Sequence, residues 1–373
     1  MQERDVFMAG IGSYSPGDPV PFDQIEDVLG RLTEAPPKIL RWIDRMQPIM
    51  KDLLDIDYAY YALDSETREP TENNISMSVK AAHKALNMAG IGANDIDLLV
   101  YGGAFMESLC PPISALIQDA LDIRYCAEMA IHSNCTSICK ALQVASDLIA
   151  NGRYTTALVL TSQISSAFLR AEYFNQSILT KKQAILRWFL SDGAGALVLT
   201  AENSQKPRFK ILDTYIESVG AGFDSSMYTE LLRVSSSNLA EVYEQGRHHI
   251  NQDFKKVSEL SPGLFEQGIR NMVAKTVIGA SPEALANVKW FLVTIPIKHL
   301  MDICVKTAHE QWDSSLQFYT NLHSRGYVGP PSTFIALDQF MQETALSPGE
   351  IVVTFVEESS KWMQGGFFLE YCT

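Results

Sequence analysis

Hydrophobic and polar residues follow two distinct rhythms along this chain. Apolar residues recur at helical spacing over Ser76–Ala89, over the stretch that follows Cys135 and over Ser332–Gln342. Continuous apolar runs such as Leu98–Tyr101 and Ala157–Leu160 alternate with these helices and are bounded by turn residues. Short uninterrupted apolar runs predict strands that are buried on both faces. The chain therefore predicts an α/β protein.

The second half of the chain repeats the order of the first. A helix at Ser76–Ala89 leads into a strand at Ile96–Tyr101, and a helix at Phe265–Ile278 leads into a strand at Val288–Ile295. Such repetition predicts a duplicated αβαβα arrangement. We expect two mainly five-stranded, mainly parallel sheets with helices outside and buried central helices between them. The helix after Cys135 should be one of the central pair.

Lys206-Pro207 marks the expected boundary between the halves, because a new strand-like run begins at Phe209–Ile216. We assign residues 1–205 to the first half, which carries Cys135, and residues 206–373 to the second. The polar segment 228–265 lacks the alternation of its surroundings, and we interpret it as an excursion that caps a site.

Composition indicates an ordinary globular protein, with 46% apolar and 20% charged residues. No apolar run is long enough to cross a membrane, and the charged start lacks a signal-peptide core. The six cysteines show no paired spacing and no metal-ligand pattern. We therefore expect a cytoplasmic protein without disulfides, without metal and without a membrane anchor.

A formal net charge of −14 argues against nucleic acid as a partner, because phosphate binding needs a basic face. An acidic carrier protein could dock only on a local basic patch. Two candidates stand out, although balanced surface charge explains each at least as well. They are Lys181, Lys182 and Arg187, and Arg247 with Lys255 and Lys256.

Cys135 is the strongest candidate for chemistry. It follows a small polar segment and precedes an amphipathic helix in which Ile138, Leu142 and Ala145 share one face. Unpaired N–H groups and the helix dipole at a helix start favour a thiolate, which is the reactive form of cysteine. The alternative is an inert buried cysteine, as we expect for Cys139 one turn later.

At this point the chain resembles the β-ketoacyl synthase III family of the thiolase superfamily. The nucleophile unit Ile131–Ser162 and the glycine turn Ser191–Leu199 carry most of the likeness, with Cys135 in the nucleophile's place. Three more segments fit the family's pattern: Val79–Ile91 with Ile96–Val100, Gly326–Leu337, and Ser347–Val353.

The resemblance implies a duplicated thiolase-like fold and acyl transfer to Cys135 from coenzyme A or the phosphopantetheine of an acyl-carrier protein. These thioesters are substrates, and no permanently bound cofactor is implied. The resemblance also implies a homodimer in which the strand Ala157–Leu160 lies beside its two-fold mate. In the family, a histidine and an asparagine then stabilise the enolate that decarboxylation of a malonyl thioester creates.

Those two residues are where this sequence departs from the family. Its pattern places Pro296 at the histidine and Tyr327 at the asparagine. His299 is then a candidate base, or else an ordinary helix histidine. Tyr327 could donate a hydrogen bond or merely fill the pocket.

Further candidates rest on the same comparison. The altered C-terminal loop leaves the backbone N–H of Ser359 or Ser360, together with that of Cys135, as an oxyanion hole. Glu107 could act as an acid or base, as a glutamate does in the related hydroxymethylglutaryl synthases, or it could simply be exposed. Trp42 could line the coenzyme entrance.

Three functions remain open at this stage. The first is an acyltransferase of fatty-acid-like or specialised biosynthesis that moves an acyl group through Cys135 to a second substrate. The second is a decarboxylating condensing enzyme with rearranged oxyanion donors. The third is a non-catalytic subunit of a heterodimeric synthase.

Overall fold

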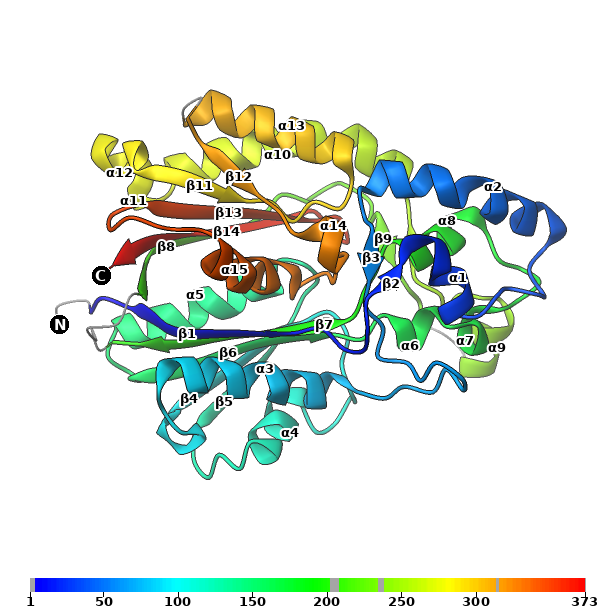
Figure 1. Cartoon of the computed structure of the whole chain (residues 1–373), viewed down its shortest axis with the longest axis horizontal. Coiled ribbons are helices and arrows are strands. Elements are labelled where there is room, and N and C mark those ends of the chain that lie inside the picture. Colours follow the sequence, from blue (N-terminus) through cyan, green and yellow to red (C-terminus); the bar gives the residue numbers. More distant parts are fainter. Residues whose placement is uncertain (1–3, 202–207, 234–237, 313–314, 373) are drawn as a thin grey trace.

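The computed structural model describes residues 4–201, 208–233, 238–312 and 315–372. Five layers are stacked in it, helix, sheet, helix, sheet, helix (Figure 1). The predicted boundary at 205/206 lies outside the described residues, so the division into halves at that point stays a prediction.

Two sets of five strands form the sheets. The first has the order β5-β4-β6-β7-β1, and the second has the order β12-β11-β13-β14-β8. The sets join where Phe7 pairs with Lys210 and Met8 with Phe209, which makes one continuous ten-stranded sheet. The strands are β1 (Phe7–Tyr14), β4 (Leu98–Gly103), β5 (Ala127–His132), β6 (Thr156–Gln163), β7 (Gly193–Thr200), β8 (Arg208–Ser218), β11 (Val288–Leu292), β12 (Gln317–Tyr319), β13 (Ile351–Glu358) and β14 (Met363–Cys372).

The same strand order in both sets confirms the predicted duplication. The expectation of mainly parallel strands was wrong. β4 pairs parallel with β5 and β6, and β11 pairs parallel with β12 and β13. The other pairings inside each set are antiparallel. β13 and β14 are joined by a tight hairpin, and such a short connection permits only antiparallel neighbours.

The layer between the sheets consists of α5 (Ser137–Ala150) and α15 (Ser332–Glu343), as predicted. One apolar cluster joins Leu142 of α5, Leu337 of α15 and strands of both sets. Gly102 and Gly365 let α5 approach the sheets closely. A Cβ at Gly102 would lie 2.5 Å from the Ser137 carbonyl oxygen, and one at Gly365 would lie 2.8 Å from the Cys139 Cβ.

Outer helices cover the remaining faces. α3 (Asn74–Ala89) and α4 (Ile113–Ala120) cover the first set, and α10 (Phe254–Ala274) and α13 (Lys298–Gln311) cover the second (Figure 1). Asn73 caps α3 by accepting from the Ser76 backbone, and Gly90 ends it in a left-handed conformation.

A lobe at one end of the sheets is built from the helix α2 and several short elements around its own apolar cluster (Figure 1). These elements are β2 (Val20–Pro21), α1 (Ile25–Val28), α2 (Pro37–Leu54), β3 (Tyr58–Ala59), α6 (Ser166–Leu169), α7 (Ala171–Phe174), α8 (Lys181–Ala184), β9 (Met227–Tyr228), α9 (Leu239–Glu244) and β10 (Asn251–Gln252). The remaining short helices are α11 (Val277–Ala280), α12 (Pro282–Ala286) and α14 (Leu322–Arg325), with three 3-10 turns at Phe22–Gln24, Ala93–Asp95 and Ile185–Trp188.

The predicted dimer strand was wrong. Ala157–Leu160 belongs to β6, which pairs with β4 on one side and β7 on the other, so it has no free edge. The outer strand of this set is β5. Strand order depends on pairing between distant segments, and the apolarity of Ala157–Leu160 reflects a central position in the sheet.

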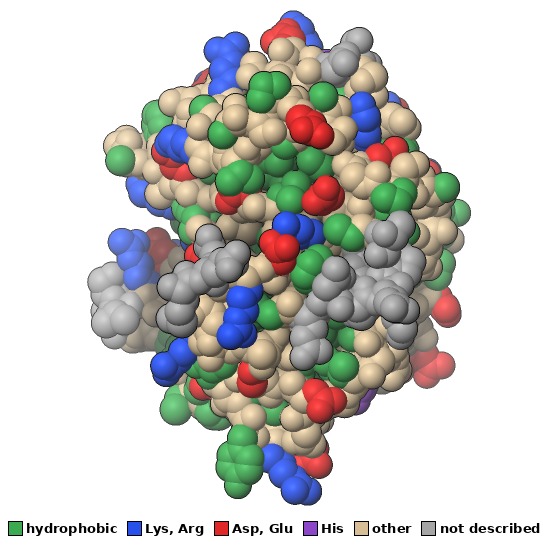
Figure 2. All heavy atoms as spheres, turned by 90° about the vertical axis from the view of Figure 1, so that its left-hand side faces the viewer, with side chains coloured by type: hydrophobic (Ala, Val, Ile, Leu, Met, Phe, Trp, Pro, Cys, Tyr) green, Lys and Arg blue, Asp and Glu red, His purple; other side chains and the backbone are tan. Residues whose placement is uncertain are grey.

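The two candidate basic patches are locally neutralised. Arg187 is buried and forms an ion pair with Glu26, because a guanidinium in the core needs a carboxylate partner. Lys182, Arg247 and Lys256 each lie within ion-pair distance of an acidic residue. On the face that Figure 2 shows, acidic and basic side chains are interspersed. No helix in the described part of the chain is long and apolar enough to cross a membrane.

Candidate active site

Cys135 lies in the turn between β5 and α5, just before the N-cap residue Thr136. Its side chain is half-buried and contacts both the central core and the core of the lobe. The cysteine therefore precedes the helix instead of opening its first turn. Its thiol stands where the layered core meets the lobe.

Two cavities meet at Cys135. The smaller, of about 80 Å³, has mostly apolar walls, and the larger, of about 370 Å³, is more polar. Four residues line both, namely Asn134, Cys135, Met227 and Tyr327. The thiol therefore borders open space in both cavities, as a nucleophile requires.

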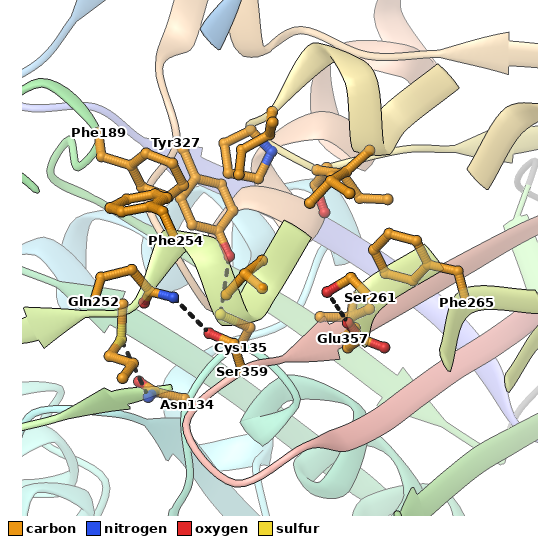
Figure 3. Close-up of a pocket in the computed structure, with 18 of the residues that line it drawn as sticks. Asn134, Cys135, Phe189, Gln252, Phe254, Ser261, Phe265, Tyr327, Glu357 and Ser359 are labelled. Carbon is orange, nitrogen blue, oxygen red and sulfur yellow. Dashed lines mark hydrogen bonds between the residues drawn. The ribbon is translucent and has the colours of Figure 1, made fainter. Parts of the chain in front are cut away.

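Tyr327 is the direct partner of the thiol. Its Oη lies 2.9 Å from Cys135 Sγ, within hydrogen-bond distance (Figure 3). The Tyr327 ring is buried and packs edge-on against Phe189, and its carbonyl accepts from the Ser191 N–H at 2.8 Å. Both readings of Tyr327 from the sequence therefore apply, because its ring fills the site and its hydroxyl reaches the nucleophile.

The pKa of Cys135 is raised, whereas the sequence predicted a lowered pKa and a thiolate. Burial raises it to about 12, and the nearby Glu358 carboxylate adds to the rise, while the Tyr327 hydroxyl opposes it. Burial and the adjacent thiol also raise the pKa of Tyr327 well above its ordinary value. The resting pair is therefore a neutral thiol beside a neutral phenol, and the expected thiolate at the helix start was wrong.

Burial is the main cause of this rise, and Glu358 adds to it. Its buried carboxylate accepts from the Thr136 N–H at 3.3 Å, from the Thr136 hydroxyl at 2.6 Å and from the Ser133 hydroxyl at 2.9 Å. The Ser360 hydroxyl donates to its other oxygen at 2.8 Å. The charge that the start of α5 favours is thus supplied by Glu358, which also fixes the turn carrying Cys135.

Glu357, one residue earlier, faces the opposite layer and lines the small cavity. The Ser261 hydroxyl donates to it at 2.7 Å and the Gln364 amide at 3.3 Å. Burial raises the pKa of Glu357 to about 7. Neither carboxylate is among the residues predicted from the sequence. The signal was present, since consecutive residues of a strand point to opposite faces and this pair ends a buried strand.

Ser359 lines the small cavity and Ser360 the larger one. Their backbone N–H groups, together with that of Cys135, remain our predicted oxyanion donors. Pro296 also lines the small cavity, which places it near the thiol as the comparison with the family implied.

His299 does not lie at the site, and its prediction as base was wrong. It is exposed near the start of α13 and lines neither cavity, whereas Ile297 and Leu300 line the small one. Successive helix positions are about 100° apart, so the face that carries Leu300 turns His299 outward. An imidazole does line the larger cavity, that of His132, whose Nε2 lies 3.0 Å from the Ala104 carbonyl oxygen.

Glu107 and Trp42 also lie apart from both cavities. Glu107 accepts from the backbone and side-chain amides of Asn74 at the start of α3, both at 3.1 Å, which is a helix-capping role. Trp42 stacks on Trp188 with the Lys181 ammonium over its ring. In this chain, neither residue contacts the space around Cys135.

The chain is similar to known proteins in sequence and in fold. The sequence model of the 3-oxoacyl-[acyl-carrier-protein] synthase III family matches residues 129–220, which include Cys135 and the glycine turn. The β-ketoacyl-[acyl-carrier-protein] synthase III of Clostridium perfringens is 25% identical over 359 residues, which is 94% of this chain and 94% of that protein.

Solved structures share the fold over almost the whole chain. A tetronic acid condensing enzyme superposes with a TM-score of 0.77 at 21% identity, covering 98% of this chain and 99% of its own. Synthase III of Aquifex aeolicus gives 0.71 at 17% identity, with 98% and 100% covered.

The layered duplicated fold, which in this chain carries a cysteine before a central helix, is thus shared with the solved condensing enzyme and synthase III structures. The family model over residues 129–220 and the relatives over almost the whole chain make this chain similar to the β-ketoacyl-[acyl-carrier-protein] synthase III proteins.

Proposed function

We propose that this protein is a thioester-dependent acyltransferase, in which Cys135 takes an acyl group from coenzyme A or an acyl-carrier protein and passes it to a second substrate. The observation that carries this proposal is the position of the Cys135 thiol. It stands at the junction of two cavities, 2.9 Å from a hydroxyl that can move its proton.

The loading step conserves protons. Sγ of Cys135 attacks the thioester carbonyl, and the bond between that carbon and the carrier sulfur breaks. The thiol proton passes to Tyr327 Oη, which gives its own proton to the departing sulfur. The step exchanges one thiol for another, so a neutral Cys–Tyr pair can run it without a permanent thiolate.

The second step reverses the proton's path. A hydroxyl, amine or carbon nucleophile of the acceptor attacks the acyl-cysteine, and its proton returns to Sγ as the carbon–sulfur bond breaks. The oxyanion formed in each step would be held by the backbone N–H groups of Cys135 and of Ser359 or Ser360. The small cavity has no imidazole among the described residues that line it.

The proposed location, acyl donor and oligomeric state are consistent with this reaction. We place the protein in the cytoplasm for two reasons. All six cysteines are free thiols in the structure, and acyl thioesters are cytoplasmic metabolites. Acyl-CoA or an acyl-carrier protein is the proposed donor. We propose a homodimer joined through β5, because this outer strand is half-exposed.

Acylation of intact protein tests the proposal. Incubation with a panel of acyl-CoA thioesters should add one acyl mass to the wild type and to a Cys110→Ser control, which removes an exposed cysteine. Cys135→Ala should gain none. Equal acylation of Cys135→Ala and wild type would remove the idea.

A decarboxylating condensing enzyme is the second candidate, favoured by the Tyr327 hydroxyl at the place of the family's asparagine. Pro296 offers no donor at the histidine's place, and one oxyanion donor is typically worth about 10²–10³ in rate. Carbon dioxide release from malonyl-CoA by the acylated enzyme would establish condensation, and no release would count against it.

A non-catalytic subunit is the third candidate, favoured by the raised pKa of Cys135. Because burial suppresses the resting thiolate in any case, slow alkylation by iodoacetamide does not separate this candidate from the acyltransferase. Acyl loading on Cys135 does separate the two candidates, because a non-catalytic subunit should show none.

A further inference from the structure

The small cavity has apolar walls with a carboxyl group set into them. Phe189, Phe254, Phe265 and Leu300 are among the residues that line it. Among the described lining residues, Glu357 is the one carboxylate, and none is a lysine or arginine. A negative charge in such surroundings is unfavourable unless something compensates it.

The protein itself compensates Glu357 poorly. It receives one good hydrogen bond, from Ser261 (Figure 3), and a long one from Gln364. Glu358 next to it receives four. A carboxylate has about four acceptor positions. Glu357 therefore has acceptor capacity left over, and no cation among the described lining residues competes for it.

A second acceptor belongs to the same cavity. Gln252 also lines it, and its buried Oε1 has no hydrogen-bond partner within the described part of the chain. Its Nε2 donates to Ser359 Oγ at 3.2 Å, which fixes the amide (Figure 3). The wall of the cavity thus contains acceptor atoms among aromatic and aliphatic groups.

We propose that the small cavity selects acyl chains that carry a hydroxyl or amino group, and that Glu357 is the residue that recognises this donor. The inference rests on the proposed function, in which the thioester end of the chain lies at Cys135. Glu357 and Ser261 lie to one side of Cys135, beside Phe265 (Figure 3). The donor is therefore remote from the thioester, with methylene groups between them packed against the aromatic wall.

The charge of the Glu357 carboxyl further restricts which end groups the acyl chain can carry. The pKa of Glu357, raised to about 7 by burial, lets the carboxyl be charged or neutral near neutral pH. A hydroxyl is compatible with either form, whereas a protonated amine needs the carboxylate. A chain ending in a second carboxylate is excluded, because no cationic side chain lines the described wall.

Competition between matched thioesters tests the inference. Wild-type protein is given equal amounts of hexanoyl-CoA and its terminally hydroxylated or aminated counterpart, with shorter and longer chains as further pairs. The masses on Cys135 are then compared. For the best-fitting length we expect the polar chain to be favoured about tenfold or more, since it gains a hydrogen bond to a charged group.

Variants separate recognition from folding. Glu357→Leu should favour the plain chain while it is still acylated, which shows that it folds. Glu357→Gln should keep part of the hydroxyl preference and lose the amine preference. Glu259→Gln, an exposed change on α10, should behave as wild type. Equal use of plain and polar chains of every length by the wild type, or an unchanged preference in Glu357→Leu, would overturn the inference.

Binding to the Cys135→Ala variant, measured by isothermal titration calorimetry with the same pairs, separates this inference from the proposed function. Tighter binding of the polar chain with no acylation of the wild type would remove the acyl-transfer proposal and support the recognition by Glu357. Acylation of the wild type with equal binding of both chains would support the acyl-transfer proposal and remove the recognition by Glu357.

Discussion

Glu357 and Glu358 end the same strand and have opposite surroundings. Glu358 faces the turn before α5, and its carboxylate accepts four hydrogen bonds from Ser133, Thr136 and Ser360. Glu357 faces α10, where an apolar cavity surrounds its carboxyl and the pKa rises to about 7. The alternation of a β-strand thus gives adjacent, chemically identical residues different tasks. One holds the turn that carries the nucleophile, and the other faces the ligand space.

Removal of Glu358 should have the largest effect in this comparison. Glu358→Ala leaves the buried Thr136 hydroxyl and N–H without an acceptor, and we expect a loss of about 3 kcal/mol in the free energy of unfolding. Urea unfolding measures it. Glu358→Gln, which keeps one acceptor, should lose less. A loss below that of the exposed control Glu259→Gln would contradict the role given to Glu358.

Removal of the Tyr327 hydroxyl should have the next largest effect. Tyr327→Phe keeps the buried ring and removes the group 2.9 Å from Sγ, so acyl loading on Cys135 should slow by about 10- to 100-fold. Stopped-flow or quenched mass spectrometry measures the rate. Tyr61→Phe is the matched control, because the Tyr61 hydroxyl is buried without a partner in the described structure. Equal rates for the two variants would show that the hydroxyl moves no proton.

Glu357 should make stability depend on pH. Its pKa in the folded state is about 7, above the value near 4.5 for an unperturbed glutamate, so the folded state binds the proton more tightly. The contribution of Glu357 to the free energy of unfolding should therefore fall, by up to about 3 kcal/mol, as pH rises from about 4.5 to 7. The difference in unfolding free energy between wild type and Glu357→Gln, measured across this range, isolates the effect. A difference that is independent of pH would place the Glu357 carboxyl in water.

Substitution of His299 should have the smallest effect. His299→Ala removes an exposed side chain outside both cavities, so acyl loading should stay within about twofold of wild type and stability within about 0.5 kcal/mol. A large loss of loading rate would restore His299 as the base.

What the sequence could predict depended on local pattern. Helical spacing and apolar runs identified the duplicated layers, and the segment around Cys135 identified that cysteine as the candidate nucleophile, which the structure places beside two cavities. The protonation state of that cysteine does not depend on local sequence alone. Glu358, which takes over the helix-start charge, is 222 residues from Thr136 in the sequence and meets it only through the packing of α5 against the second set of strands.

The other errors have the same origin. His299 was placed near the site by its distance along the chain from Pro296, whereas the phase of α13 turns it outward. The strand Ala157–Leu160 was placed at an interface by its apolarity, which a central strand shares. Tyr327 shows the opposite case, because its alignment with the family's asparagine put it beside Cys135 and the structure brings its hydroxyl to the thiol.

The most direct test of the account is the site of acylation in the wild-type protein. After reaction with a preferred acyl-CoA, proteolysis and tandem mass spectrometry should place one acyl group on the peptide that contains Cys135 and Cys139, with the mass on Cys135. Hydroxylamine should then release it, as it does a thioester. Acylation confined to another cysteine, or none with any thioester, would contradict the claim that Cys135 carries the substrate.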